Sequence, residues 1–204
     1  MSNHFSSHQK IFLRQKKEIA ELFGFETRNK YSIESENGDQ LAFAGEDGKN
    51  IGSVIWRQIF GHWRPFSLRI LNNDRSLIFT AVHPFGFIFQ RLDVIGIDGR
   101  KIGSAQQRFS FLEKKFDLLD AEGVVIMKIS TPIWKPWTFA ITKNGLESAL
   151  ILKKWSGLLK EVFTDADNFT IDFKDKNLSE NERRIIVAAA LLIDIVYFEQ
   201  KASN

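Results

Sequence analysis

An acidic stretch near the C-terminal end of the chain carries the residue types best suited to holding a metal ion. It runs from Thr164 to Asp175 and opens with two aspartates in a D-x-D spacing. Calcium takes several oxygen ligands, carboxylates among them, from one flexible loop. A site of this kind would combine side-chain carboxylates with backbone carbonyls. The residues predicted to hold the metal are Asp165, Asp167, Phe169, Asp172 and Asp175.

The stretch departs from the EF-hand calcium loop in three places. Phe169 stands at the third ligand position, Thr170 replaces the turn glycine, and Lys176 occupies the place of the bidentate acid. Calcium binding is therefore expected to be weak, with a dissociation constant of about 10⁻⁴ to 10⁻³ M. The alternative is a polar turn that enters a strand whose Phe169, Ile171 and Phe173 face the core.

Covalent catalysis finds little support among the remaining residues. The sequence contains no P-loop, dinucleotide glycine pattern, G-x-S-x-G or H-E-x-x-H. Of its four histidines, His4 and His8 fall in a start that is expected to be disordered over residues 1–9. His62 and His83 are each isolated among aromatic residues, which indicates structural roles. We therefore predict that the protein is not an enzyme in the covalent sense.

Basic residues gather near the N-terminus. Apolar residues recur at helical spacing from Lys10 to Phe23, and Gly24 follows as a stop signal. A basic amphipathic helix can lie on an anionic lipid surface, each basic residue contributing about 1 kcal/mol. The alternative is a helix that packs on the main domain with a solvated outer face. The predicted lipid-contact residues are Lys10, Arg14, Lys16 and Lys17.

Tryptophans stand beside cations in two short segments. These segments are Phe60–Arg64, with the sequence FGHWR, and Ile133–Trp137, with the sequence IWKPW. Indole rings beside cations can anchor a protein at a membrane interface. The alternative is that these loop aromatics cover one end of the fold.

An almost unbroken apolar run extends from Ile185 to Phe198 and contains one acid, Asp194. As a helix its 14 residues would cover only roughly 21 Å, whereas a bilayer core is about 30 Å thick. Because the run is apolar on every face, it favours a buried core helix, with membrane insertion as the alternative. Ser179 and Glu182 have the spacing of a capping box at its start. A buried acid needs a partner, and Asp194→Leu is expected to be tolerated or moderately destabilising.

Turn signals recur between the ends of the chain and alternate with short β-rich runs. Asn-Gly and Asp-Gly turns flanked by such runs are a strong hairpin signal. The turns are Asn37-Gly38, Asp47-Gly48, Asn72-Asn73-Asp74, Asp98-Gly99, Glu122-Gly123 and Asn144-Gly145. The runs are Tyr31–Glu34, Phe66–Leu71, Leu77–Val82, Phe116–Leu119, Val124–Ile129, Trp137–Thr142 and Phe169–Phe173. Many hairpins in one domain predict a mainly β sandwich or barrel, and a helix apolar on all sides would thread a closed sheet.

Composition and charge limit the classes of protein to which this chain can belong. The 204 residues are 44% hydrophobic and 26% charged, which is typical of a globular domain. A net charge of only +3 gives no reason to expect a nucleic-acid partner. The absence of cysteine excludes disulfides and palmitoylation and suits a reducing compartment. Without a secretory h-region or a glycine at position two, the protein is predicted to be cytoplasmic and without a myristoyl group.

Several stretches, in order from about residue 11 to residue 199, resemble the phospholipid scramblase family. The most specific of them is the segment that contains Asp-Ala-Asp-Asn-Phe. The stretches are FGFETRNKY (23–31), RPFSLRIL (64–71), KWSGLLKE (154–161), FTDADNF (163–169) and LIDIVYFE (192–199).

The resemblance implies a tubby-like fold, a closed antiparallel barrel of about 12 strands around a hydrophobic C-terminal helix. This architecture agrees with the threaded helix inferred above and would occupy one domain over residues 10–201. The resemblance also implies calcium-dependent, ATP-independent mixing of phospholipids between leaflets, with Asp165 and Asp167 where the family's calcium segment begins. The chain departs from the family in lacking the cysteine-rich stretch, which would fall near Asn50–His62, and the proline-rich N-terminal extension. Lys176 also replaces the last acid of the calcium segment.

Two classes of function follow. In the first, a monomer binds an anionic phospholipid surface peripherally, on the inner face of a membrane, and scrambles its lipids with weakly bound calcium. In the second, a soluble tubby-like module binds a protein partner or a phosphoinositide and has no transport activity. Vesicle binding separates the two classes.

Overall fold

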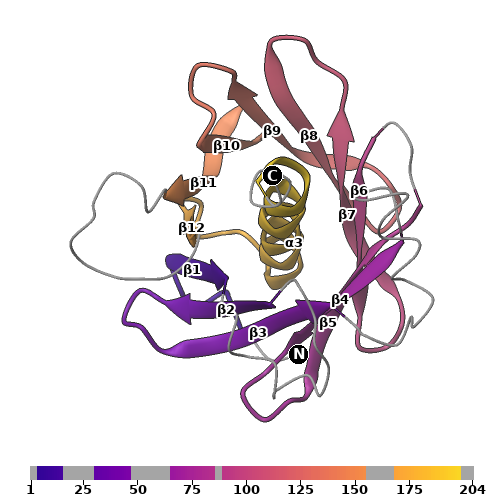
Figure 1. Cartoon of the computed structure of the whole chain (residues 1–204), viewed down its shortest axis with the longest axis vertical. Helices are drawn as coiled ribbons and strands as arrows, with labels where there is room; N and C mark the ends of the chain where they lie inside the picture. The colour runs from indigo at the N-terminus through magenta and orange to yellow at the C-terminus, as the bar shows by residue number, and fades with distance from the viewer. Residues whose placement is uncertain (1–3, 16–29, 47–64, 86–88, 155–167, 199–204) are drawn as a thin grey trace.

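The computed structural model describes residues 4–15, 30–46, 65–85, 89–154 and 168–198. Within these ranges the strands close into an antiparallel barrel around one helix, α3 (Glu180–Tyr197), which lies at the centre of the ring (Figure 1). Neighbouring strands are consecutive in sequence, and β1 pairs with both β2 and β12 to close the ring. The strands are β1 (Lys10–Gln15), β2 (Lys30–Ser35), β3 (Gln40–Glu46), β4 (Phe66–Leu71), β5 (Leu77–His83), β6 (Arg91–Gly96), β7 (Lys101–Arg108), β8 (Glu113–Asp120), β9 (Val125–Pro132), β10 (Thr138–Lys143), β11 (Leu146–Lys154) and β12 (Asn168–Phe173).

Five hairpins form where turn signals predict them, and the sixth signal, Asp47-Gly48, lies outside the described residues. Gly38, Gly99, Gly123 and Gly145 all have positive φ, a backbone conformation that glycine adopts without steric cost. Between the turns, side chains alternate between the inside and the outside of the barrel, as a strand requires. In β4, for example, Leu68 and Ile70 are fully buried, while the intervening Arg69 is half-buried. The predicted fold class, a closed barrel of 12 antiparallel strands around the C-terminal helix, is confirmed.

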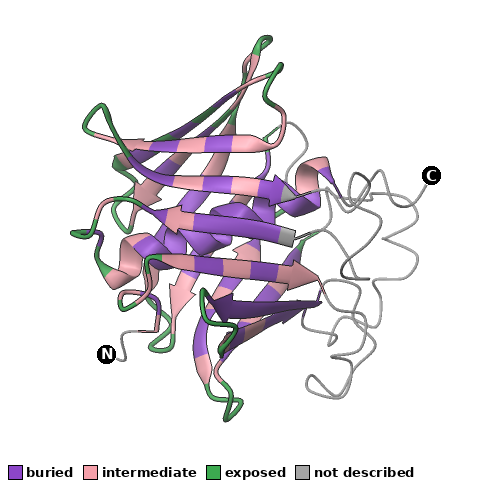
Figure 2. Ribbon diagram, turned by 90° about the vertical axis from the view of Figure 1, so that its left-hand side faces the viewer, coloured by how far each residue is buried: buried purple, intermediate pink, exposed green. Residues whose placement is uncertain are grey.

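The two ends of the barrel differ. Short turns join β2 to β3, β4 to β5, β6 to β7, β8 to β9 and β10 to β11 at one end, which we call the tight-turn end. α3 begins at this end, where Ser179 caps it in the predicted capping box with Glu182. The β7–β8 and β9–β10 connections and the last turn of α3 lie at the opposite end, which we call the long-connection end. Figure 2 shows several exposed turns on its left-hand side.

The apolar run forms the core of the barrel. Every residue of α3 from Ile185 to Ile195 is at most 5% exposed, because inward side chains of the strands surround it. The buried-helix interpretation of this run is therefore confirmed. No helix among the described residues is long and apolar enough to cross a membrane.

The prediction of an N-terminal helix from Lys10 to Phe23 is wrong in its first part. Lys10–Gln15 is strand β1, with Ile11 and Leu13 turned into the core. The segment forms a strand rather than a helix because, as a strand, it makes the hydrogen bonds with β2 and β12 that close the barrel. The rest of the expected helix, including Lys16 and Lys17, lies outside the described residues.

The turn before β1 also differs from the expectation of a disordered start over residues 1–9. Phe5 is fully buried against the core. The Glu180 carboxylate accepts hydrogen bonds from the backbone N–H groups of Phe5 and Ser6, at 3.1 and 3.0 Å. Arg183 Nη1 donates to the carbonyls of Phe5 and His8. Charged residues at the start of α3 thus fasten this turn to the tight-turn end.

Gly103 on β7 lies where the helix and the wall of the barrel approach each other closely. A Cβ at this position would collide with Ile185 Cδ1 and with the backbone oxygen of Leu119. Gly103→Ala is therefore expected to lower the free energy of unfolding by about 1–3 kcal/mol, a typical cost of overpacking a core. Urea denaturation measures the change.

Gly96→Ala is the matched control for this prediction. Its Cβ would first meet the Asp98 side chain, which can move, so the loss should be smaller. An alanine at position 103 that costs no more than the one at position 96 would contradict the close packing.

Candidate functional site

The structure distributes the predicted metal-site residues along β12 and beyond it. Phe169, near the start of β12, points into the barrel, where its ring lies 5.8 Å from that of Phe198. Asp172 faces outward, in register with Lys10 of β1 and Leu150 of β11. Asp175 lies beyond the far end of the strand, and its carboxylate accepts the N–H of Asn177. At about 3.3 Å per residue, the strand separates Phe169 from Phe173 by roughly 13 Å, and Asp175 lies beyond Phe173.

These positions confirm the strand of the alternative interpretation, in which Phe169, Ile171 and Phe173 face the core, while the polar turn before it lies outside the described residues. Among the described residues, no group of three histidine or acidic side chains could hold a metal ion. Asp165 and Asp167 lie outside the described residues. Calcium binding by them stays a prediction.

Of the predicted lipid-contact residues, Lys10 and Arg14 lie on the outer face of β1 rather than on a helix. Arg14 forms an ion pair with Glu34, its Nε 3.1 Å from the carboxylate. Lys10 neighbours Asp172 across the β1–β12 pair. Because each cation has an acid beside it, this face attracts anionic lipid less than the expected basic helix would. Lipid contact by these residues stays a prediction.

A cluster of exposed apolar side chains lies at the long-connection end. We call it the aromatic rim, and it comprises Phe109, Phe111, Leu112, Ile133 and Trp134. Phe111 is 85% exposed and Trp134 71% exposed, whereas large apolar side chains normally gather inside a fold. The β5–β6 connection carries two more exposed aromatics, Phe85 and Phe89. Exposed apolar side chains gathered in this way indicate an interaction surface.

The two connections that form the rim support each other. The N–H of Ile133 in the β9–β10 connection donates to the carbonyl of Leu112 in the β7–β8 connection, at 3.3 Å. Within the β7–β8 connection, the rings of Phe109 and Phe111 meet edge to face, 4.7 Å apart. The rim is therefore held from within by a backbone hydrogen bond and a ring contact.

Basic residues flank the rim. Arg108, Lys115 and Lys135 are all exposed beside it. Arg108 pairs with Asp117 and Lys115 with Glu113, so acids offset part of this charge. The rim thus combines apolar side chains with a modest excess of positive charge, as membrane-anchoring surfaces do.

The end of α3 lies beneath the rim and is packed with rings and cations. The side chain of Lys114 on β8 turns inward, and its Nζ lies 4.4 Å from the ring centroid of Tyr197. Burial raises the pKa of the Tyr197 phenol, although a hydrogen bond from Gln107 opposes the rise. Trp137 stacks on Phe198, with ring centroids 5.3 Å apart. The rim therefore rests on a base of packed rings.

A buried ion pair fixes this end of the helix inside the barrel. Lys153 Nζ on β11 lies 3.1 Å from Asp194 Oδ1. The Tyr31 hydroxyl on β2 donates to Asp194 Oδ2 at 2.8 Å. The Lys153 ammonium also lies over the ring of Phe198, 3.9 Å from its centroid. Asp194 therefore ties α3 to two strands on different parts of the wall.

Sequence reasoning found part of the rim and missed the rest. In the IWKPW segment, Trp137 covers the helix end, as the alternative predicted, while Trp134 is exposed; membrane anchoring by this segment stays a prediction. The apolar residues of the β7–β8 connection were missed, although Phe109, Phe111 and Leu112 crowd between two strands. His83 is structural, as predicted, since it is buried and stacked on Phe66 at 4.6 Å.

The architecture defines a class of protein: a closed antiparallel barrel filled by a C-terminal helix. The X-ray structure of a protein from Arabidopsis thaliana is similar, with a TM-score of 0.53 and 11% sequence identity. The likeness covers 92% of this chain and 91% of that one. At this level of identity the comparison shows the fold alone.

The sequence comparisons place the chain in a family. The scramblase family model matches residues 2–200, and the chain belongs to the scramblase family. It is 31% identical to phospholipid scramblase 1 of Homo sapiens and 32% identical to that of Rattus norvegicus, over 98% and 95% of its length. It spans only 66% and 61% of these relatives. The altered inheritance rate of mitochondria protein 25 of Saccharomyces cerevisiae is 25% identical over 93% of the chain.

Proposed function

We propose that this protein binds phospholipid membranes peripherally through the aromatic rim and moves phospholipids between the two leaflets. Family membership supports a scramblase-like protein, and lipid transport rather than covalent catalysis. The observation that carries membrane binding is the exposure of the rim, above all of Phe111 and Trp134. We expect phospholipids to be the molecules that bind at the rim.

The filled interior directs the lipid to the outside of the barrel. α3 is buried from Arg183 to Ile195 among inward side chains, so an acyl chain cannot pass through the barrel from one end to the other. Phospholipids would therefore meet the protein at its outer surface and at the rim. Inserted rings would disturb lipid packing in one leaflet, which lowers the barrier that a headgroup meets on crossing.

Calcium dependence is part of the proposal and rests on Asp165 and Asp167, where the family resemblance places the start of a calcium segment. Calcium bound there would add positive charge to the protein and so favour an anionic surface. With the incomplete ligand pattern, the effect is expected only at calcium concentrations of about 10⁻⁴ M and above.

Vesicle experiments test the proposal. The purified chain is sedimented with phosphatidylcholine vesicles that contain or lack phosphatidylserine, with calcium or with a chelator. We expect binding that phosphatidylserine and calcium strengthen. A fluorescent-lipid quenching assay on the same vesicles then measures movement between leaflets. If the protein binds no vesicles in any condition, the proposal fails, and the module that binds a protein or a phosphoinositide becomes the better description.

A further inference from the structure

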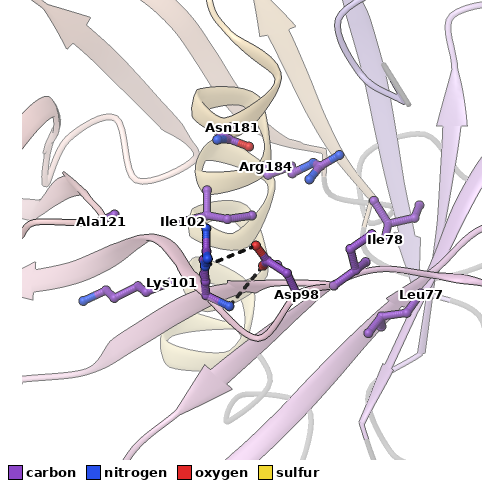
Figure 3. Close-up of a pocket in the computed structure, with 11 residues that line it drawn as sticks. Leu77, Ile78, Asp98, Lys101, Ile102, Ala121, Asn181 and Arg184 are labelled. Atoms are coloured by element: carbon purple, nitrogen blue, oxygen red, sulfur yellow. Dashed lines mark hydrogen bonds and ion pairs between the residues drawn. The ribbon is translucent and has the colours of Figure 1, made fainter. Parts of the chain in front are cut away.

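The tight-turn end of the barrel contains a cavity of about 390 Å³. It lies beside the first turn of α3, between the start of β5, the β6–β7 hairpin and the β8–β9 turn (Figure 3). Small-molecule sites in proteins typically measure about 300–1,000 Å³. The cavity is at the opposite end of the barrel from the aromatic rim, so an inference about it does not depend on the proposed function.

Most of the cavity wall is hydrocarbon. Ile78 is buried at the inner side, and Ile97 is 71% exposed on the hairpin. The volume has room for about a dozen methylene-sized groups, at roughly 30 Å³ each. The wall therefore suits a short aliphatic chain. Its apolar residues are Leu77, Ile78, Ile97, Ile102 and Ala121.

One polar group of the wall has no partner among the described residues. The Asn181 side-chain oxygen is buried and accepts no hydrogen bond. Its neighbours in the same helical turn differ, since Glu180 and Arg183 hold the N-terminal turn through several hydrogen bonds. Buried polar atoms of folded proteins are nearly always bonded, so an exception points to a missing partner. By rotating, the amide can present either its oxygen or its NH₂ group.

The charges around the cavity favour an anion. Arg100, Lys101 and Arg184 contribute to the wall, against one acid, Asp98. Arg184 is the inner cation, with a side chain only 6% exposed. Figure 3 shows Arg184 and Asn181 on α3, above the hairpin residues Asp98 and Ile102.

Acids outside the wall offset part of this positive charge. Glu180 lies 3.3 Å from Arg184 Nε, and Asp93 lies 3.2 Å from Lys101 Nζ. The field at the cavity is therefore modest. An anionic headgroup is still preferred over a cationic one, but the attraction is weak.

We propose that this cavity binds a medium-chain aliphatic anion, namely a carboxylate of about ten carbons. Its chain would lie against Ile78 and Ile102. Its carboxylate would lie near Arg184 and accept a hydrogen bond from the rotated Asn181 amide. With about a dozen heavy atoms, such a ligand is expected to have a dissociation constant on the order of 10⁻⁴ to 10⁻³ M.

Isoleucine-methyl NMR on the purified chain tests the proposal with decanoate as the probe, below its micelle concentration. Decanoate is expected to shift the methyl signals of Ile78, Ile97 and Ile102 saturably. Ile133 on the rim reports non-specific adsorption and should not follow the same curve. Decanol, decyltrimethylammonium and acetate separate the contributions of chain and charge. If decanoate shifts no cavity signal, or the ammonium compound shifts them equally, the proposal is overturned.

Variants in an exposed turn locate the binding. Ala121→Trp should fill the cavity and weaken decanoate binding at least about tenfold. Its neighbour Glu122 is exposed and does not contribute to the wall, so Glu122→Trp is the control and should bind as the wild type does. Asn181→Leu, which removes the hydrogen-bonding amide, should weaken binding several-fold. Unchanged affinity in both Ala121→Trp and Asn181→Leu would place decanoate elsewhere and overturn the proposal.

Discussion

Asp194→Leu is expected to destabilise the barrel by about 3–5 kcal/mol, the usual cost of removing one partner of a buried ion pair. The Lys153 side chain is fully buried. Without the Asp194 carboxylate, its ammonium would remain in the core and lose the opposite charge that lies 3.1 Å from it. Tyr31 would lose the acceptor of its hydroxyl proton as well. Urea denaturation followed by tryptophan fluorescence measures the loss.

This expectation replaces the one from sequence alone, that leucine would be tolerated or moderately destabilising. The sequence indicates that a buried Asp194 needs a partner, but it does not show that the partner is a lysine with no solvent exposure. A buried acid that is neutral could be exchanged for leucine at little cost. A buried acid that balances a buried cation cannot.

The double variant Lys153→Met/Asp194→Leu is the control. It removes both charges and leaves side chains of similar size, so it should recover most of the stability lost in the single variant. Tyr31→Phe removes only the hydroxyl and should lower the free energy of unfolding by about 1–3 kcal/mol. If Asp194→Leu proves as stable as the wild type, or the double variant is no better than the single one, the ion pair does not stabilise the helix as described.

Phe111→Ser/Trp134→Ser is expected to weaken binding to phosphatidylserine vesicles about 100-fold. Transfer of a large apolar side chain out of water contributes about 1.5–3 kcal/mol, so the loss of two such side chains removes at least about 3 kcal/mol. Each 1.4 kcal/mol is about tenfold in affinity. Both residues are highly exposed, so their replacement should leave the free energy of unfolding nearly unchanged. Vesicle co-sedimentation measures the binding.

Val124→Ser/Leu146→Ser is the matched control for the rim. These residues are also large, apolar and exposed, at 60% and 74%, but they lie at the tight-turn end. Their replacement should leave vesicle binding unchanged. If both double variants weaken binding equally, adsorption is non-specific, and if neither does, the rim is not the docking surface.

The sequence by itself determined seven of the twelve described strands, most of the turns and the fate of the apolar run. Glycines such as Gly99 and Gly145 follow residues that favour turns, and their positive φ depends on local sterics alone. The run from Ile185 to Phe198 is apolar on every side, which leaves a helix no stable place except an apolar surrounding. These features are local, so a linear pattern records them.

Tertiary structure alone decided the state of Lys10–Gln15, the partner of Asp194 and the formation of the rim. β1 is a strand because β2 and β12, far apart in sequence, each need a neighbour. Asp194 contacts Lys153, 41 positions away in sequence, because β11 passes the end of α3 beside Asp194. The rim gathers connections that only strand pairing brings to one end of the barrel. Each of these outcomes depends on contacts between distant segments, and a pattern of neighbouring residues does not encode them.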